Sequence, residues 1–142
     1  MINIGIADDD ALVRQTLREL LSKYDDIAVS WIAKDGQEAL DLFHSSEVES
    51  TVQAVLVDVQ MPKMDGLALA KALLEEHPDI AILILTTFTA DSIVDDAMAL
   101  GVRGFVAKED GASSLAGAIR QAVAGNLVLS PTSSAIISDQ AR

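Results

Sequence analysis

The chain has 142 residues, half of them hydrophobic, which is enough to bury one core and suits a single α/β-sized domain. Its 10 basic and 22 acidic residues give a formal charge of −12, which argues against nucleic-acid binding by this segment, because such a face needs clustered positive charge. The absence of cysteine excludes disulfides, thiolate metal sites and cysteine nucleophiles. The apolar runs are too short to cross a membrane and the N-terminus lacks the plan of a signal peptide, so we expect a cytoplasmic protein without membrane contact.

Strand-like and helix-like stretches alternate along the chain. Short apolar runs predict five strands, at residues 3–7, 27–33, 52–57, 80–85 and 104–107. The third and fourth runs are apolar almost without interruption, which is typical of strands covered on both faces. Apolar residues at helical spacing follow each run, so the sequence predicts βα units on a parallel sheet.

Polar residues and glycines mark the ends of the predicted helices. Asp10 is placed to cap the first helix, and Asp35 with Glu38 resembles a capping box that opens the second. Gly101 follows the fourth helix as a left-handed C-terminal cap. The fifth helix is predicted from about residue 113 to residue 125.

Polar side chains also stand where the predicted strands end. They are Asp8 and Asp9 after the first strand, Asp58 after the third, Thr86 after the fourth and Lys108 after the fifth. Because the carboxyl ends of parallel strands meet at one edge of a sheet, we expect these groups to converge there. Converging carboxylates repel one another unless a cation intervenes, and Mg²⁺ prefers such hard oxygen ligands. Lys108 and Thr86 could then hold the oxygens of a phosphoryl group.

The segment "VLVDVQMPKMDG" makes Asp58 the candidate nucleophile. An aspartate can form an acyl phosphate when a metal and a positioned cation assist its attack on phosphorus. Pro62 and Gly66 would shape the turn so that Asp58 and the backbone carbonyl of Gln60 face the metal, while Asp65 caps the third helix. A lone aspartate before a proline turn is more often a local cap, so the hypothesis depends on the other strand-end residues.

These motifs, in this order, resemble those of the response-regulator receiver domain of two-component signalling, over roughly residues 2–124. The acidic pair of that family is matched by Asp8 and Asp9, and its phosphoacceptor by Asp58. Its hydroxyl residue after the fourth strand is matched by Thr86, and its lysine after the fifth by Lys108. The resemblance implies a flavodoxin-like, doubly wound (βα)5 fold with a five-stranded parallel sheet of order 2-1-3-4-5.

The resemblance also assigns roles to neighbouring residues. Phe105, three residues before the lysine, is similar to the family's rotating switch residue. Gln60 and Phe88 stand where the family tunes dephosphorylation. Glu109 follows the lysine where many receivers have proline, and together with "LTTF" and "ALGVRGFVAKED" the pattern resembles receivers of LuxR/NarL-type transcription regulators.

Some of these residues have simpler structural explanations. A phenylalanine in a strand, such as Phe105, is usually core, and Trp31 is predicted to be a packing residue. His44 and His77 lie near predicted helix ends, where a basic side chain favours the helix dipole, and we interpret both as structural.

The resemblance implies a signalling protein rather than an enzyme, one that catalyses only its own phosphorylation and dephosphorylation. It would take its phosphoryl group from a sensor histidine kinase with Mg²⁺ as cofactor, and form a homodimer on phosphorylation. We expect residues 1–125 to be the receiver and residues 126–142 a linker, in which Ser130 and Pro131 could open a short helix. DNA would be bound only through a helix-turn-helix domain that is not part of this sequence.

Three alternatives stay open at this stage. A stand-alone receiver would act through protein contacts alone. A Mg²⁺-dependent phosphohydrolase is less favoured, because Gln60 stands where haloacid-dehalogenase-type phosphatases usually carry a second aspartate. A flavin or nucleotide binder would need a glycine-rich phosphate loop after the first strand, where "DDDAL" repels phosphate unless a metal intervenes.

Overall fold

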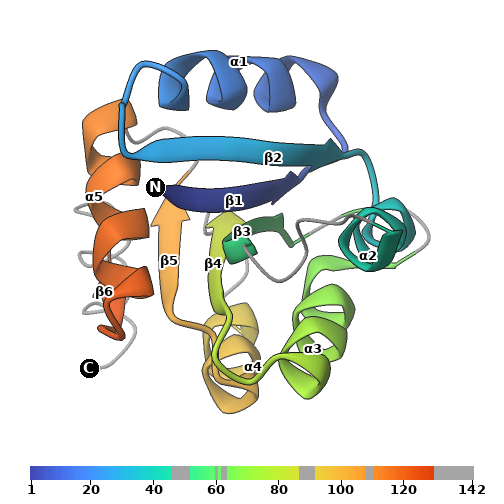
Figure 1. Cartoon of the computed structure of the whole chain (residues 1–142). Coiled ribbons are helices and arrows are strands. Elements are labelled where there is room, and N and C mark those ends of the chain that lie inside the picture. The colour runs from blue at the N-terminus through green and yellow to red at the C-terminus, as the bar shows by residue number, and fades with distance from the viewer. Residues whose placement is uncertain (46–51, 60, 62–63, 87–91, 108–110, 130–142) are drawn as a thin grey trace.

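Strands and helices alternate in the computed structural model, which describes residues 1–45, 52–59, 61, 64–86, 92–107 and 111–129 (Figure 1). The strands are β1 (Ile2–Ala7), β2 (Ile27–Ala33), β3 (Val52–Asp58), β4 (Ala81–Thr86), β5 (Gly104–Ala107) and β6 (Val128–Leu129). The helices are α1 (Ala11–Leu21), α2 (Gly36–Ser45), α3 (Gly66–Glu76), α4 (Ser92–Leu100) and α5 (Ala112–Val123). Each predicted strand is present within one residue of its predicted bounds.

The strands form one parallel sheet of order β2-β1-β3-β4-β5-β6. Its first five strands have the predicted 2-1-3-4-5 order. The short strand β6 was not predicted, because two residues are too few for a periodic pattern. It pairs Val128 with Gly104 and Leu129 with Phe105, so the segment after α5 lies along the outer edge of β5.

Two apolar layers enclose the sheet. Helices α1 and α5 pack on one face, and α2, α3 and α4 pack on the other (Figure 1). The central strands β3 and β4 are buried on both faces, as their uninterrupted apolar sequences predict: Val55 and Ile82 belong to one layer, Leu56 and Leu83 to the other. The carboxyl ends of β1, β3 and β4 therefore extend from a part of the sheet that is covered on both faces.

The predicted helix caps are present. The Asp10 side chain accepts hydrogen bonds from the backbone N–H groups of Leu12 and Val13, and Gly101 has φ +96° in the left-handed region. Asp35 accepts from the N–H of Glu38 at 2.7 Å, but the Glu38 carboxylate accepts from Lys34 at 3.0 Å instead of from Asp35 itself. The bond from the Glu38 carboxylate back to the chain is thus made one residue earlier than in the usual capping box.

Polar contacts join elements on both faces. On one face, Arg120 of α5 makes a bidentate ion pair with Asp26, at 2.7 and 2.9 Å, and lies over the Tyr24 ring. This hydrogen-bonded guanidinium holds the pKa of the Asp26 carboxyl below its usual value, so the pair's contribution to stability is present above that usual pKa and is lost as pH falls through the lowered one. On the other face, His44 of α2 lies 2.6 Å from Glu76 of α3.

Trp31 packs against the neighbouring strand β1 at a glycine, where no side chain projects. It stands opposite Gly5 in the β1–β2 register and is 7% exposed. A Cβ atom at Gly5 would lie 2.3 Å from the Trp31 ring, far inside van der Waals contact. The glycine is therefore required by the indole ring, not by its own backbone conformation.

We expect Gly5→Ala to lower the free energy of unfolding by about 1–3 kcal/mol, the usual cost of overpacking a core. Denaturant unfolding followed by far-UV circular dichroism measures this change. Gly117→Ala is the matched control: outside its own stretch of α5, no atom lies within 4 Å of the added Cβ, so the helix should gain about 0.5–1 kcal/mol. Equal effects of the two substitutions would contradict the described packing of Trp31.

Candidate functional site

Strand register brings two acidic residues together at the carboxyl edge of the sheet. Ala7 of β1 pairs with Val57 of β3. The residues that follow them, Asp8 and Asp58, are therefore neighbours at that edge. Asp58 also lies opposite Leu85 of β4, which places it over the centre of the sheet. The convergence predicted from the strand ends is thus present for these two residues.

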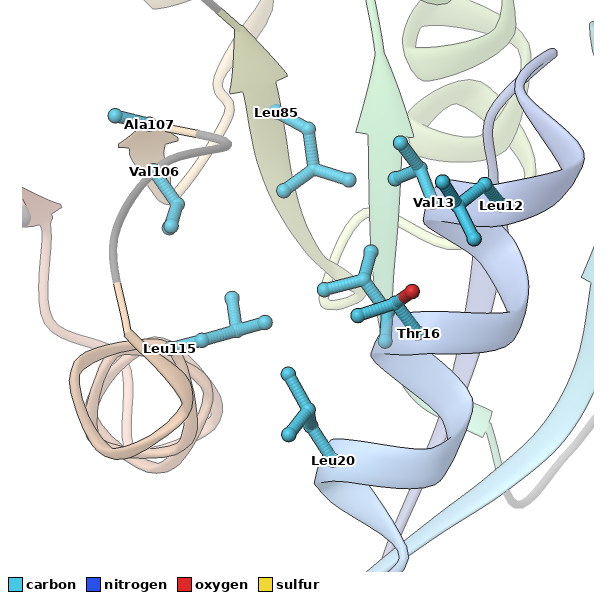
Figure 2. A pocket seen from close by; sticks show the side chains of 9 residues that line it. Leu12, Val13, Thr16, Leu20, Leu85, Val106, Ala107 and Leu115 are labelled. Atoms are coloured by element: carbon cyan, nitrogen blue, oxygen red, sulfur yellow. The ribbon is translucent and has the colours of Figure 1, made fainter.

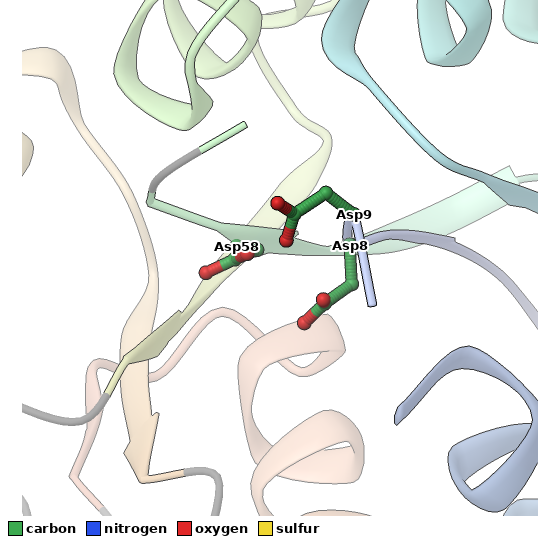
Figure 3. A group of neighbouring side chains, drawn as sticks. All are labelled: Asp8, Asp9 and Asp58. Carbon is green, nitrogen blue, oxygen red and sulfur yellow. The ribbon is translucent and has the colours of Figure 1, made fainter. Parts of the chain in front are cut away.

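Asp9 completes a cluster of three carboxylates. One oxygen each from Asp8, Asp9 and Asp58 lie within 4.8 Å of one another (Figure 3). Asp8 is 0% exposed and Asp58 is 5% exposed, whereas Asp9 is exposed to solvent. The cluster therefore has two buried members and one member at its opening.

Hydrogen bonds orient the loop that carries Asp8 and Asp9. The Asp8 N–H donates to the carbonyl of Ala33 in β2 at 3.0 Å, and the Asp8 carboxylate accepts from the N–H of Asp10 at 2.9 Å. The Asp8 carbonyl accepts from Nη1 of Arg14 in α1 at 2.7 Å. The strand β2, the loop itself and helix α1 each hold the Asp8 residue at a different atom.

Gly66 explains the sharp turn after Asp58. The Gly66 N–H donates to the carbonyl of Val59 at 2.9 Å, and a Cβ at Gly66 would lie 2.1 Å from the Asp58 carbonyl oxygen. Asp65 caps α3 by accepting from the N–H of Ala68 at 2.8 Å, as predicted. Only glycine allows the start of α3 to approach the backbone of Asp58 so closely.

The cluster suits a small divalent cation. Mg²⁺ binds oxygens at about 2.1 Å in octahedral geometry, and the three oxygens here, within 4.8 Å of one another, would have to move inward to reach one such ion. Mg²⁺ commonly uses one or two carboxylates and keeps several waters, which the exposed side of Asp9 allows. The charge of the ion would offset the repulsion among the three carboxylates.

The remaining predicted site residues are placed only in part. Thr86 ends β4 and pairs with Ala107 of β5, but the structure describes only its place in the strand. Phe105 is fully buried in β5, opposite Ile84. Three further predicted site residues, Gln60, Phe88 and Lys108, lie outside the described residues, and so do Pro62, Ser130 and Pro131.

An apolar groove lies between α1 and α5 beside the acidic edge, with a volume of about 220 Å³ (Figure 2). Leu12, Val13 and Thr16 of α1 form one wall and Leu115 of α5 the other, over Leu85 at the end of β4. No sequence pattern predicted this groove. The feature of the sequence that could have indicated it is Leu12, an apolar residue outside the buried face of α1. Leu12 is 72% exposed.

Within the described part of the chain, no helix is long and apolar enough to cross a membrane.

Comparison with known proteins gives one consistent family. The model of the response regulator receiver domain matches residues 4–120. The transcriptional regulatory protein YxjL of Bacillus subtilis is 32% identical over 142 residues, 99% of this chain and 63% of YxjL. Response regulator GacA of Pseudomonas protegens is 33% identical over 131 residues, 92% of this chain and 60% of GacA. The chain thus spans about three fifths of the length of these regulators.

Solved structures give the same result. A two-component response regulator of the LuxR family from Aurantimonas sp. SI85-9A1 superposes with a TM-score of 0.86 at 27% identity, over 98% of this chain and 96% of that one. The response regulator ChrA of a heme-sensing two-component system superposes with a TM-score of 0.78 at 29% identity, over 98% of this chain and 65% of that one. The resemblance to LuxR/NarL-type receivers inferred from the motifs is confirmed.

We expect Asp9→Asn to weaken Mg²⁺ binding, and to stabilise the metal-free protein because it relieves repulsion in the cluster. A tenfold loss of affinity removes about 1.4 kcal/mol of Mg²⁺-dependent stabilisation when the ion is in excess. Thermal unfolding with and without Mg²⁺ measures both effects. Asp41→Asn removes the same charge from the exposed face of α2 and should leave the response to Mg²⁺ unchanged; the same response in both variants would contradict this metal site.

Proposed function

The chain belongs to the response regulator receiver domain family, and from that premise we propose that Asp58 accepts a phosphoryl group from a sensor histidine kinase. The observation that carries the proposal is the position of Asp58, a nearly buried carboxylate that ends the central strand β3 within the three-carboxylate cluster. Receiver domains of response regulators are signalling proteins rather than classical enzymes. In our proposal the only chemistry of this chain is its own phosphorylation and dephosphorylation.

The proposed reaction is an in-line transfer between two nucleophiles. A carboxylate oxygen of Asp58 forms a bond to phosphorus as the bond between phosphorus and the kinase histidine nitrogen breaks, and that nitrogen keeps the bonding electron pair. Mg²⁺ held by Asp8, Asp9, Asp58 and the Gln60 carbonyl would neutralise charge on the phosphoryl oxygens. The close approach of Gly66 to the Asp58 backbone would help to hold the residue that carries the attacking carboxylate.

We assign the remaining family roles to the matching residues of this chain. Lys108 would pair with the phosphoryl group and Thr86 would donate a hydrogen bond to it, which couples the modification to β4 and β5. Phe105, fully buried in β5, would be the residue that changes rotamer. Gln60 and Phe88 would set the lifetime of the phosphoryl group.

The proposed output is transcriptional control. Of the relatives, YxjL is a transcriptional regulatory protein and GacA is a response regulator. Each is considerably longer than the part of it that matches this chain. We propose that residues 1–125 act as the receiver, that residues 126–142 lead to a DNA-binding domain outside these 142 residues, and that phosphorylation promotes a homodimer. Because the kinase's phosphohistidine is cytoplasmic in such a scheme, the chain would act in the cytoplasm. A stand-alone receiver is the second candidate, and a phosphohydrolase is less favoured.

The first test is labelling with acetyl phosphate and Mg²⁺. We expect one phosphoryl group per chain, stable to acid and labile to base, and none on Asp58→Asn, because an amide cannot act as the nucleophile. Intact-mass spectrometry measures the increment. Asp41→Asn should label like the wild type, whereas equal labelling of Asp58→Asn would move the phosphoacceptor elsewhere.

The second test separates labelling from response. In Thr86→Ala and Lys108→Ala, labelling by acetyl phosphate should fall less than the response to phosphorylation, measured as dimerisation. The reason is that each residue is assigned to contact the bound phosphoryl group and couple it to a two-state element, and not to perform the attack. Sedimentation velocity with beryllofluoride as phosphoryl mimic measures dimerisation in each variant. An undiminished response to the mimic in both variants would exclude this relay.

A further inference from the structure

We propose that Arg14 of α1 is a positioning residue for Mg²⁺ binding at the cluster of Asp8, Asp9 and Asp58, a role that rests on the proposed function of that cluster. Arg14 was not singled out by any motif in the sequence. Its side chain is half-buried, and its Nη1 donates to the Asp8 carbonyl oxygen at 2.7 Å. That oxygen belongs to the peptide group that joins Asp8 to Asp9, the two acidic residues contributed by the β1–α1 loop.

The planarity of the peptide group gives this one hydrogen bond an effect on two ligands. The six atoms from the Cα of Asp8 to the Cα of Asp9 lie near one plane, so a fixed carbonyl oxygen restricts the orientation of that plane. The N–H and carboxylate of Asp8 are already held by Ala33 and Asp10. Asp9 is exposed, so the plane that leads to it is a main restraint on where its carboxylate can lie.

Arginine suits this role because of its charge and its shape. A hydrogen bond from a guanidinium is charge-assisted and stronger than one between neutral groups. The guanidinium stays charged and presents its N–H donors at fixed angles in one plane, which gives the bond to the Asp8 carbonyl a defined direction. Arg14 lies in the first turn of α1, where its backbone N–H donates to the Asp10 carbonyl at 3.0 Å. Its backbone is thus held by the helix while its side chain binds the loop.

A purely electrostatic role of Arg14 predicts the opposite result from a positioning role. If the guanidinium acted only as a positive charge near the carboxylates, its removal would strengthen Mg²⁺ binding, because one source of repulsion toward the cation would be lost. If the guanidinium holds the Asp8–Asp9 peptide, its removal weakens Mg²⁺ binding, because the two carboxylates must be ordered by the ion itself. The sign of the change therefore separates the two roles.

The experiment is an NMR titration of the whole chain with MgCl₂, followed through backbone amide shifts. We expect Arg14→Met to raise the Kd for Mg²⁺ about tenfold, the lower end of the effect seen when a partner behind a metal ligand is lost. Arg14→Lys keeps the charge and one donor group and should give an intermediate Kd. Arg18→Met is the matched control, because Arg18 is an exposed arginine one turn further along the same helix, and its Kd should equal that of the wild type.

Circular dichroism without Mg²⁺ establishes that each variant is folded before its Kd is compared. In acetyl phosphate labelling, Arg14→Met should raise the Mg²⁺ concentration at half-maximal rate about tenfold while the rate at saturating Mg²⁺ falls less. A Kd for Arg14→Met equal to or lower than that of Arg18→Met would overturn the positioning role. If the wild type were not labelled at all, the proposed function would fail, and the Mg²⁺ titration would still decide the role of Arg14.

Discussion

Repulsion among three carboxylates is the constraint around which the carboxyl edge of the sheet is built. Two of them, Asp8 and Asp58, are buried, where charges interact more strongly than in water. Their backbones stay adjacent because they continue paired strands: β1 and β3 would have to lose ladder hydrogen bonds for these two residues to separate. The apolar layers on both faces of the sheet thus hold together groups that would otherwise move apart.

The same constraint explains the close packing around the cluster. Gly66 lets the start of α3 lie against the Asp58 backbone, and Gly36 likewise lies where a Cβ would be 2.4 Å from the Met64 carbonyl. These contacts hold the backbone of Asp58 and of Met64 close to neighbouring segments. A cation at this edge would therefore meet Asp8 and Asp58 on backbone that is already ordered, so that part of the ordering cost would be met by folding and not by binding.

The sequence predicted most of the fold because most of it follows local rules. Uninterrupted apolar runs identified β3 and β4, and Asp10, Asp65 and Gly101 marked helix ends through their own chemistry. The family and the strand order followed from strand-end motifs. The site was predictable where the residues themselves are distinctive, as Asp8, Asp9 and Asp58 are, and their assigned roles stay predictions.

Other features depend on tertiary geometry that no local pattern records. The contact of Arg14 with the Asp8 carbonyl requires the particular angle between α1 and β1, and an arginine in a helix is otherwise unremarkable. The groove between α1 and α5 arises only when two helices far apart in sequence lie on one face. The return contact of the Asp35 capping box shifted to Lys34, because the exact path of the turn decides which N–H is in reach.

The two residues of β6 also change what the sheet can offer to another chain. An uncovered edge strand presents unpaired N–H and C=O groups on which a strand from a second molecule can add. Here Val128 donates to the Arg103 carbonyl at 2.8 Å, and a Cβ at Gly104 would lie 2.7 Å from the Val128 carbonyl oxygen. Where β6 lies, the outer edge of β5 is occupied by the chain itself, so at that stretch a second molecule cannot add a strand directly to β5.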